Sequence, residues 1–308
     1  MPLSARARAA DNAKILGQAA AIAYESAAVG ERWALSQGFT AGTFEFIDGG
    51  DTQGFVVQDD TSILVAFRGT QPNHPVDWLS DAKAHHVRWA HNVGKVHTGF
   101  YEALDLVWRD GQGALPRRLA NRGNRNVWIT GHSLGGALAE LCAARAGFDP
   151  RITAIPIEAV YTFGQPRVGD TEFATLLQNK MGVSVHRFVN DRDIVPRVPL
   201  FSMGYCHYGN MTFFDHTGAA GEPTSAIETL KTAVTFAERA LSAEPLSQLA
   251  GLAGDLLTIA NPLLGQERRD EIIRARWNAI LQSGIENVSD HDMRTCYLDR
   301  LGATLGPV

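Results

Sequence analysis

Residues 127–136 constrain the fold of this chain more than any other stretch, and they read V-W-I-T-G-H-S-L-G-G. The first four residues are β-branched or aromatic, which favours a short buried strand. An alanine- and leucine-rich run without proline begins at Leu134, and its composition predicts a helix as far as Arg145. Ser133 stands between strand and helix inside the pattern G-x-S-x-G. This order predicts a nucleophile elbow, a tight turn that presents the serine hydroxyl at the carboxyl edge of a sheet.

Predicted strands alternate with predicted helices around this elbow, and such alternation indicates an α/β sheet. Residues 63–67 are continuously apolar, as expected of a central strand that is buried on both faces. We expect a first helix at 11–29, ended by Gly30, and another helix at 98–108. Further strands are expected at 43–47, 54–57, 62–67, 155–163 and 183–189, followed by a ribbon that pairs 205–207 with 211–214.

The character of the chain changes to helix at residues 222–283, where prolines separate three predicted helices. We interpret this stretch as a helical insertion or cap within a single domain that spans residues 1–308. The net charge of -5 argues against a nucleic-acid partner. The alanine-rich N-terminus predicts an amphipathic helix and shows no signal peptide. We therefore expect a cytoplasmic protein or a secreted one whose leader has been removed.

Acyl transfer through a serine requires a base, an acid that orients the base, and donors for the developing oxyanion. In hydrolases with a nucleophile elbow, the acid follows the serine in the sequence and the histidine comes last. Asp191 and Asp193 both follow the predicted strand 183–189. We favour Asp193, because the apolar residues after it can shield its carboxylate. Asp191 stands beside an arginine and resembles a solvated surface charge.

Three histidines follow Asp193 in the sequence, namely His207, His216 and His291. His207 lies in an aromatic stretch, which is more typical of a packed core imidazole than of a catalytic base. The residues by themselves do not rank His216 against His291.

A second group of histidines invites a metal hypothesis. No carboxylate or cysteine stands near them with the spacing of a metal ligand, so we expect neither a metal nor a cofactor. The members of this group are His85, His86, His91 and His97.

Several motifs, in the right order, resemble the class 3 lipase family of triacylglycerol lipases and related esterases. They read A-F-R-G-T, V-H-T-G-F, V-W-I-T-G-H-S-L-G-G-A-L-A, T-F-G-Q-P-R-V-G-D and D-I-V-P-R-V-P. The similarity covers residues 10–214 and resumes at D-H-x-M-x-x-x-Y, residues 290–297. The resemblance implies an α/β-hydrolase fold with a mainly parallel central sheet. The chain departs from the fungal members in the long separation of its acid and histidine motifs and in lacking their disulfides.

The resemblance also implies roles for individual residues. It makes Asp193 the catalytic acid and His291 the catalytic base, and it places Thr70 and Leu134 in the oxyanion hole. With Ser133 as nucleophile, these residues would hydrolyse lipid-like carboxylic esters through an acyl-enzyme.

Two alternatives stay open beside that function. One is a phospholipase A1 or an esterase for short or aromatic acyl groups on the same fold. The other is a non-catalytic acyl-binding protein, which the retention of the serine, aspartate and histidine in the expected order disfavours.

We expect the segment from residue 71 to residue 85 to be a mobile lid over Ser133; the alternative is a fixed surface loop in which Trp78 only packs. Val76, Trp78 and Leu79 would form an apolar face that covers the acyl pocket in water and turns outward at a lipid surface. The expected partners are therefore a lipid or other ester substrate and, peripherally, a lipid interface. The sequence leaves the oligomeric state open.

Overall fold

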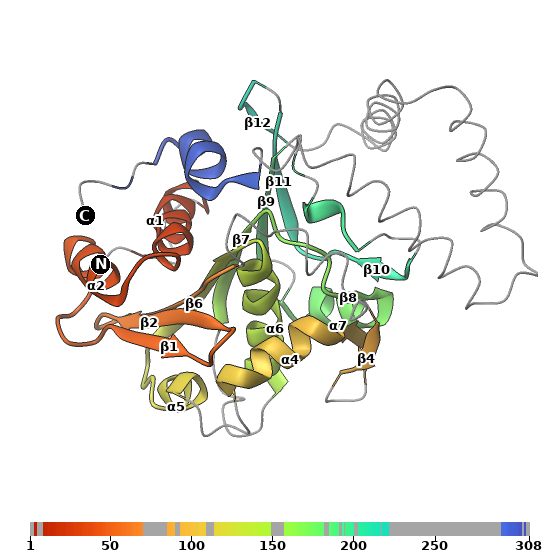
Figure 1. Ribbon diagram of the computed structural model, residues 1–308, viewed down its shortest axis with the longest axis horizontal. Helices are drawn as coiled ribbons and strands as arrows, with labels where there is room; N and C mark the ends of the chain where they lie inside the picture. Colours follow the sequence, from red (N-terminus) through yellow and green to blue (C-terminus); the bar gives the residue numbers. More distant parts are fainter. Residues whose placement is uncertain are drawn as a thin grey trace, which may run out of the picture.

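The computed structural model describes residues 3–4, 9–69, 85–89, 93–108, 114–148, 157–181, 185–190, 193, 195–199, 203–215, 217–221, 291–303 and 305. Within these residues, eight strands form the main sheet in the order β1-β2-β3-β6-β7-β9-β11-β12 (Figure 1). They are β1 (Glu45–Asp48), β2 (Gln53–Gln58), β3 (Ser62–Phe67), β6 (Asn126–His132), β7 (Ile157–Phe163), β9 (Val185–Asn190), β11 (Asn210–Phe214) and β12 (Ala220–Gly221).

The run from β3 through β6, β7 and β9 to β11 is parallel, whereas β1, β2 and β12 pair antiparallel at the two edges. A mainly parallel central sheet was expected, and the structure has one. Every residue of β3 is buried. Its side chains alternate between two apolar clusters, with Val65 in one and Leu64 in the other, so both faces of the sheet are covered.

Helices cover the two faces of the sheet, and each face has its own set (Figure 1). One face carries α4 (Thr98–Trp108), α5 (Ala114–Ala120), α6 (Leu134–Phe148) and α7 (Thr171–Met181). The other face carries α1 (Ala9–Ile22), α2 (Ala27–Ser36) and the π-helix η6 (Met293–Leu298). The C-terminal η6 packs beside the N-terminal α1, so the two ends of the described chain meet on this face.

A smaller sheet of four strands lies in the order β10-β8-β5-β4 among the described residues. Its members are β4 (His86–Arg88), β5 (Lys95–His97), β8 (Gly169–Asp170) and β10 (Tyr205–Cys206). The predicted ribbon of 205–207 with 211–214 is therefore wrong. Residues 210–214 join β9 instead, where the ring of Phe214 stacks on that of Phe188 with 6.0 Å between centroids.

The predicted helix at 11–29 is also wrong in its extent. Two helices, α1 and α2, cover this stretch, and residues 23–26 between them are not helical. Ser26 caps α2 by accepting a hydrogen bond from the Val29 N–H group. Gly30, the predicted stop, lies inside α2, where a Cβ would stand 2.5 Å from the ring of Phe44. The glycine is needed for this close approach and does not end the helix.

Several predictions fall outside the described residues. One is the helical insertion at 222–283, on which the organisation of residues 1–308 as one domain also depends. The others are the three lid residues Val76, Trp78 and Leu79. None of the described helices is long and apolar enough to cross a membrane.

Candidate active site

Ser133 occupies the sharp turn between β6 and α6. Its φ of 59° is the only positive value of a non-glycine residue in the described chain. This backbone conformation is strained for a residue with a Cβ, so it persists only where the surroundings enforce it. The Ser133 N–H group donates to the Phe163 carbonyl at 2.9 Å. Glycines at 131 and 135 let the turn close, because a Cβ on either would collide with backbone atoms of the neighbouring segments.

Ser133 directly precedes α6, and the chain just after β3 packs against it. Leu134 is the first residue of α6, and the first N–H groups of a helix lack partners within it and favour a negative charge. Gly69, just after β3, approaches from the neighbouring strand, because a Cβ there would stand 3.2 Å from the Ser133 Cβ. Thr70, the next residue, lies outside the described residues.

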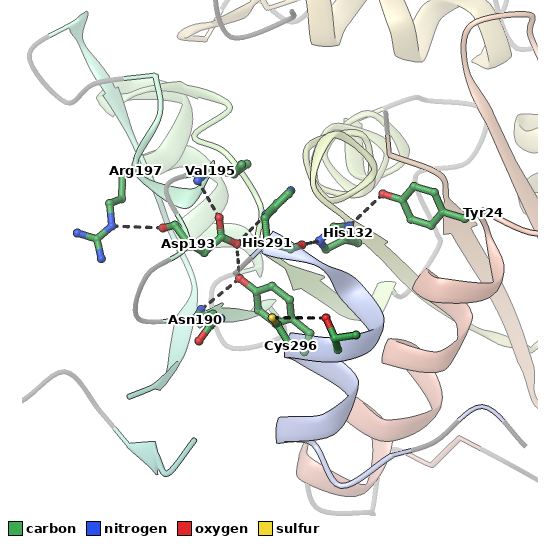
Figure 2. Close-up of polar contacts among 10 residues, drawn as sticks. Tyr24, His132, Asn190, Asp193, Val195, Arg197, His291 and Cys296 are labelled. Carbon is green, nitrogen blue, oxygen red and sulfur yellow. Dashed lines mark hydrogen bonds and ion pairs between the residues drawn. The ribbon is translucent and has the colours of Figure 1, made fainter. Parts of the chain in front are cut away.

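Asp193 and His291 form a buried pair beyond the end of β9 (Figure 2). His291 Nδ1 lies 2.7 Å from Asp193 Oδ2, and the two side chains are 7% and 0% exposed. The Val195 N–H group donates to Asp193 Oδ1 at 2.8 Å, and the Tyr297 hydroxyl donates to Oδ2 at 2.6 Å. A neutral imidazole that donates from Nδ1 to the carboxylate keeps a lone pair on Nε2. His291 Nε2 is buried without a hydrogen-bond partner among the described residues.

Gly164, just after β7, is where these groups converge. It follows Phe163, whose carbonyl accepts the Ser133 N–H hydrogen bond. A Cβ on Gly164 would stand 2.7 Å from Asp193 Oδ2 and 2.8 Å from His291 Cε1. The carboxyl ends of the parallel strands β6, β7 and β9 thus bring Ser133, Gly164 and Asp193 to one edge of the sheet, and the segment just before η6 places His291 against them.

Three residues that the sequence analysis did not single out contact this site, namely Tyr297, Gly164 and Tyr24. Tyr297 and Gly164 had a signal in the motifs D-H-x-M-x-x-x-Y and T-F-G-Q-P-R-V-G-D, whereas Tyr24 had none beyond its residue type. Tyr24 contacts His132, the residue before Ser133, with its hydroxyl 2.9 Å from Nδ1.

The other histidines take different positions. His207 is within 2.8 Å of the Pro196 carbonyl through Nε2, and burial lowers its pKa well below the ordinary value. His216 lies outside the described residues. His86 and His97 face each other across β4 and β5. The described part of the chain contains no group of three or more His, Cys, Asp or Glu side chains arranged to hold a metal ion.

Together, the mainly parallel sheet covered on both faces, the serine elbow and the buried Asp–His pair define an α/β-hydrolase fold. Residues 64–203 match the family described as lipase (class 3), which confirms the resemblance found in the sequence motifs.

Known lipases are similar to this chain in sequence and in fold. Triacylglycerol lipase OBL1 of Arabidopsis thaliana is 32% identical over 223 residues, which cover 56% of this chain and 42% of that protein. The secreted mono- and diacylglycerol lipase A of Penicillium cyclopium is 31% identical over 189 residues, which cover 60% and 59%. The chain thus spans less than two thirds of the length of these curated relatives.

A solved triacylglycerol lipase described by its serine protease triad has a TM-score of 0.54 and 26% identity, covering 68% of this chain and 82% of that one.

Proposed function

We propose that this protein hydrolyses carboxylic esters of lipids through an acyl-enzyme formed on Ser133. The contacts around Gly164 are the main support for this proposal. Gly164 directly follows the residue that binds the Ser133 N–H group, and it lies against the buried Asp193–His291 pair. A nucleophile, a base and an orienting acid within one site are the elements of serine acyl transfer. The solved triacylglycerol lipase with a serine protease triad supports the same chemistry.

In this mechanism, Ser133 Oγ attacks the ester carbonyl while His291 Nε2 accepts the hydroxyl proton. Asp193 holds His291 in the tautomer that leaves Nε2 unprotonated, and it stabilises the imidazolium that forms. The N–H group of Leu134, at the start of α6, and Thr70 would stabilise the oxyanion. His291 then gives the proton to the leaving alcohol. In the second half of the reaction, a water molecule attacks the acyl carbonyl and gives a proton to His291 Nε2. The acid product leaves as Ser133 Oγ takes that proton back.

The names of the relatives support glycerolipid esters as the substrate class, since they are lipases of triacylglycerols or of mono- and diacylglycerols. This favours a lipase over an esterase for short or aromatic acyl groups. We propose that Val76, Trp78 and Leu79 contact the lipid interface. Trp78→Ser should then reduce turnover of emulsified long-chain esters more than turnover of dissolved short-chain esters. Equal losses on both substrates would exclude an interfacial role.

The decisive test is covalent trapping with a fluorophosphonate ester. Mass spectrometry should locate the adduct on Ser133 in the unaltered protein, and Ser133→Ala should carry no adduct. We expect Ser133→Ala to lose about a thousandfold or more in kcat, with residual turnover from the oxyanion donors and substrate binding. A variant that keeps more than a few per cent of the activity would rule out Ser133 as nucleophile. Circular dichroism of both proteins checks that the fold is retained.

A further inference from the structure

We propose that Tyr24 and His132 are a positioning pair that fixes the main chain of His291 relative to Ser133. The inference rests on the proposed function, because it assigns the pair a part in holding the catalytic base. Neither side chain touches the reacting atoms in this proposal, so both act through His291. Figure 2 shows Tyr24, His132 and His291 in a continuous line of polar contacts.

The direction of the hydrogen bonds follows from the acceptor at one end. His132 Nε2 lies 2.6 Å from the His291 carbonyl oxygen, which can only accept. Nε2 must therefore carry the proton. Burial lowers the pKa of His132 well below the ordinary value, so the ring is neutral and Nδ1 is an acceptor. The Tyr24 hydroxyl, 2.9 Å from Nδ1, is then the donor.

The same hydroxyl reaches the end of β3. The backbone of Gly69 hydrogen-bonds Tyr24, and burial raises the pKa of this phenol, which keeps it protonated. The polar chain thus begins beside Gly69, just after β3, passes through the residue next to the nucleophile, and ends on the carbonyl of the base. It ties together three segments that are distant in the sequence.

A second contact joins the same two segments. Glu25, the neighbour of Tyr24, forms an ion pair with Arg294, three residues after His291. Both side chains are partly exposed, at 34% and 53%, so the pair contributes little by itself. It places the α1–α2 junction directly against the segment that carries the base.

Loss of the Tyr24 hydroxyl would leave Nδ1 of His132 buried without its donor, while the His291 carbonyl would still require the proton on Nε2. The ring would then be held only through Nε2, at 2.6 Å from the His291 carbonyl, and it could turn about that contact and shift the base. The His132 and His291 rings pack with centroids 4.4 Å apart, so rotation of the His132 ring would displace the His291 ring. Small errors in the placement of a catalytic group reduce kcat more than substrate binding.

Tyr24→Phe is the first test, because it removes the hydroxyl and keeps the ring. We expect kcat on a dissolved short-chain ester to fall about tenfold while KM stays within about twofold. Nitrogen-15 NMR of the His132 ring should show Nε2–H in the unaltered protein and a shifted Nδ1 signal in Tyr24→Phe, because Nδ1 loses its hydrogen-bond donor. Unchanged kcat together with an unchanged ring spectrum would overturn the proposal.

Two controls separate positioning from general destabilisation. Tyr208→Phe also removes a buried hydroxyl, one without a hydrogen-bond partner among the described residues, and it should leave kcat unchanged. Ser26→Ala weakens the N-cap of α2 two residues from Tyr24 and leaves the polar chain intact. A tenfold loss of kcat in Ser26→Ala would mean that Tyr24 acts only by stabilising the junction.

A double-mutant cycle tests whether the two residues act as a unit. His132→Gln places an amide donor near the position of Nε2, so it should retain at least fivefold more kcat than His132→Leu. In the His132→Gln background, Tyr24→Phe should have almost no further effect on kcat, because glutamine has no counterpart of the Nδ1 acceptor that the Tyr24 hydroxyl contacts. Additive losses would contradict the proposal.

The outcomes separate this inference from the proposed function. If the unaltered protein neither hydrolyses esters nor reacts with a fluorophosphonate, the proposed function fails. The NMR tautomer of His132 and its response to Tyr24→Phe still decide whether the polar chain exists. If the unaltered protein labels at Ser133 and Tyr24→Phe retains full kcat, only the positioning inference fails.

Discussion

The carboxylate of Asp193 is fully buried and accepts hydrogen bonds from three directions, from His291 Nδ1, the Val195 N–H group and the Tyr297 hydroxyl. Taking a carboxylate out of water is costly unless such donors replace the lost solvent. Burial raises the pKa of Tyr297 well above its ordinary value, so this hydroxyl remains a donor over the whole working range of the protein. It also accepts from the Asn190 N–H group at 3.1 Å, which fixes its position.

Tyr297→Phe should therefore weaken both the site and the fold. We expect the free energy of unfolding to drop by about 1–3 kcal/mol, because a buried acceptor loses a donor. The kcat for a dissolved ester should fall about three- to tenfold with KM unchanged, because Asp193 is held less firmly against His291. Urea unfolding and steady-state kinetics measure the two effects. Retention of full stability and kcat would show that the Tyr297 hydroxyl is dispensable.

Single residues differed in how far the sequence alone could place them. The G-x-S-x-G pattern located Ser133 because an elbow is a local structure. Asp193 was favoured from its apolar neighbours, and the structure finds it buried. His291 was reached only through the family resemblance, because its contact with Asp193 joins residues 98 positions apart and nothing local distinguished it from His216. Tyr297 closes the D-H-x-M-x-x-x-Y motif but was given no role, since the motif does not show that its hydroxyl reaches the carboxylate of Asp193.

At the level of elements, the site depends on how β7 ends. Gly164 has a φ of 59° and lies against both Asp193 and His291. Gly164→Ala should therefore lower kcat by about a hundredfold or more, because the new methyl group would push the acid and the base apart. Kinetics on a dissolved ester give the comparison.

Gly302→Ala is the matched control. Gly302 has nearly the same φ, 60°, and a Cβ there would meet nothing within 4 Å. It should thus share the backbone strain of Gly164→Ala, with a stability loss of about 1–2 kcal/mol, but keep its kcat. Equal losses of kcat in the two variants would mean that backbone strain, rather than displacement of Asp193 and His291 by the new methyl group, is responsible.

Elements with a strong local pattern were predicted well from the sequence. The fully buried β3 and the helix α4 have the predicted bounds, Ser62–Phe67 and Thr98–Trp108. The errors occurred where a tertiary contact decided the outcome. Gly30 continues a helix because Phe44 packs on it, and residues 210–214 join β9 because Phe214 stacks on Phe188. Neither partner can be identified from periodicity or turn residues.

For the molecule as a whole, the most unusual feature is a carboxylic acid in the interior beneath the site. Glu140 lies on α6, the helix that begins after Ser133, and is 1% exposed. The Gln165 amide donates to it from the segment after β7, and the charge of Arg187 acts on it from β9. Burial raises the pKa of Glu140 to about 8 and lowers that of Arg187 to about 10.

The raised pKa of Glu140 makes the stability of the whole fold depend on pH. Between about pH 4.5 and pH 8, the unfolded chain releases the Glu140 proton while the folded protein keeps it. Folding stability from this group is therefore complete below pH 4.5 and is lost as the pH rises, by about 1.4 kcal/mol per unit. Above pH 8 the loss levels off, because both states are ionised.

Glu140→Gln should remove this dependence, because the amide resembles the protonated acid and cannot ionise. Its gain in unfolding free energy over the unaltered protein should be below about 1 kcal/mol at pH 5 and reach about 2–4 kcal/mol at pH 8. Urea unfolding at pH 5, 6.5 and 8 measures the difference. Glu31→Gln, at an exposed position of α2, is the control, and it should not reproduce a gain that grows with pH. A gain from Glu140→Gln that is the same at all three pH values would show that Glu140 is already ionised in the folded protein near pH 5.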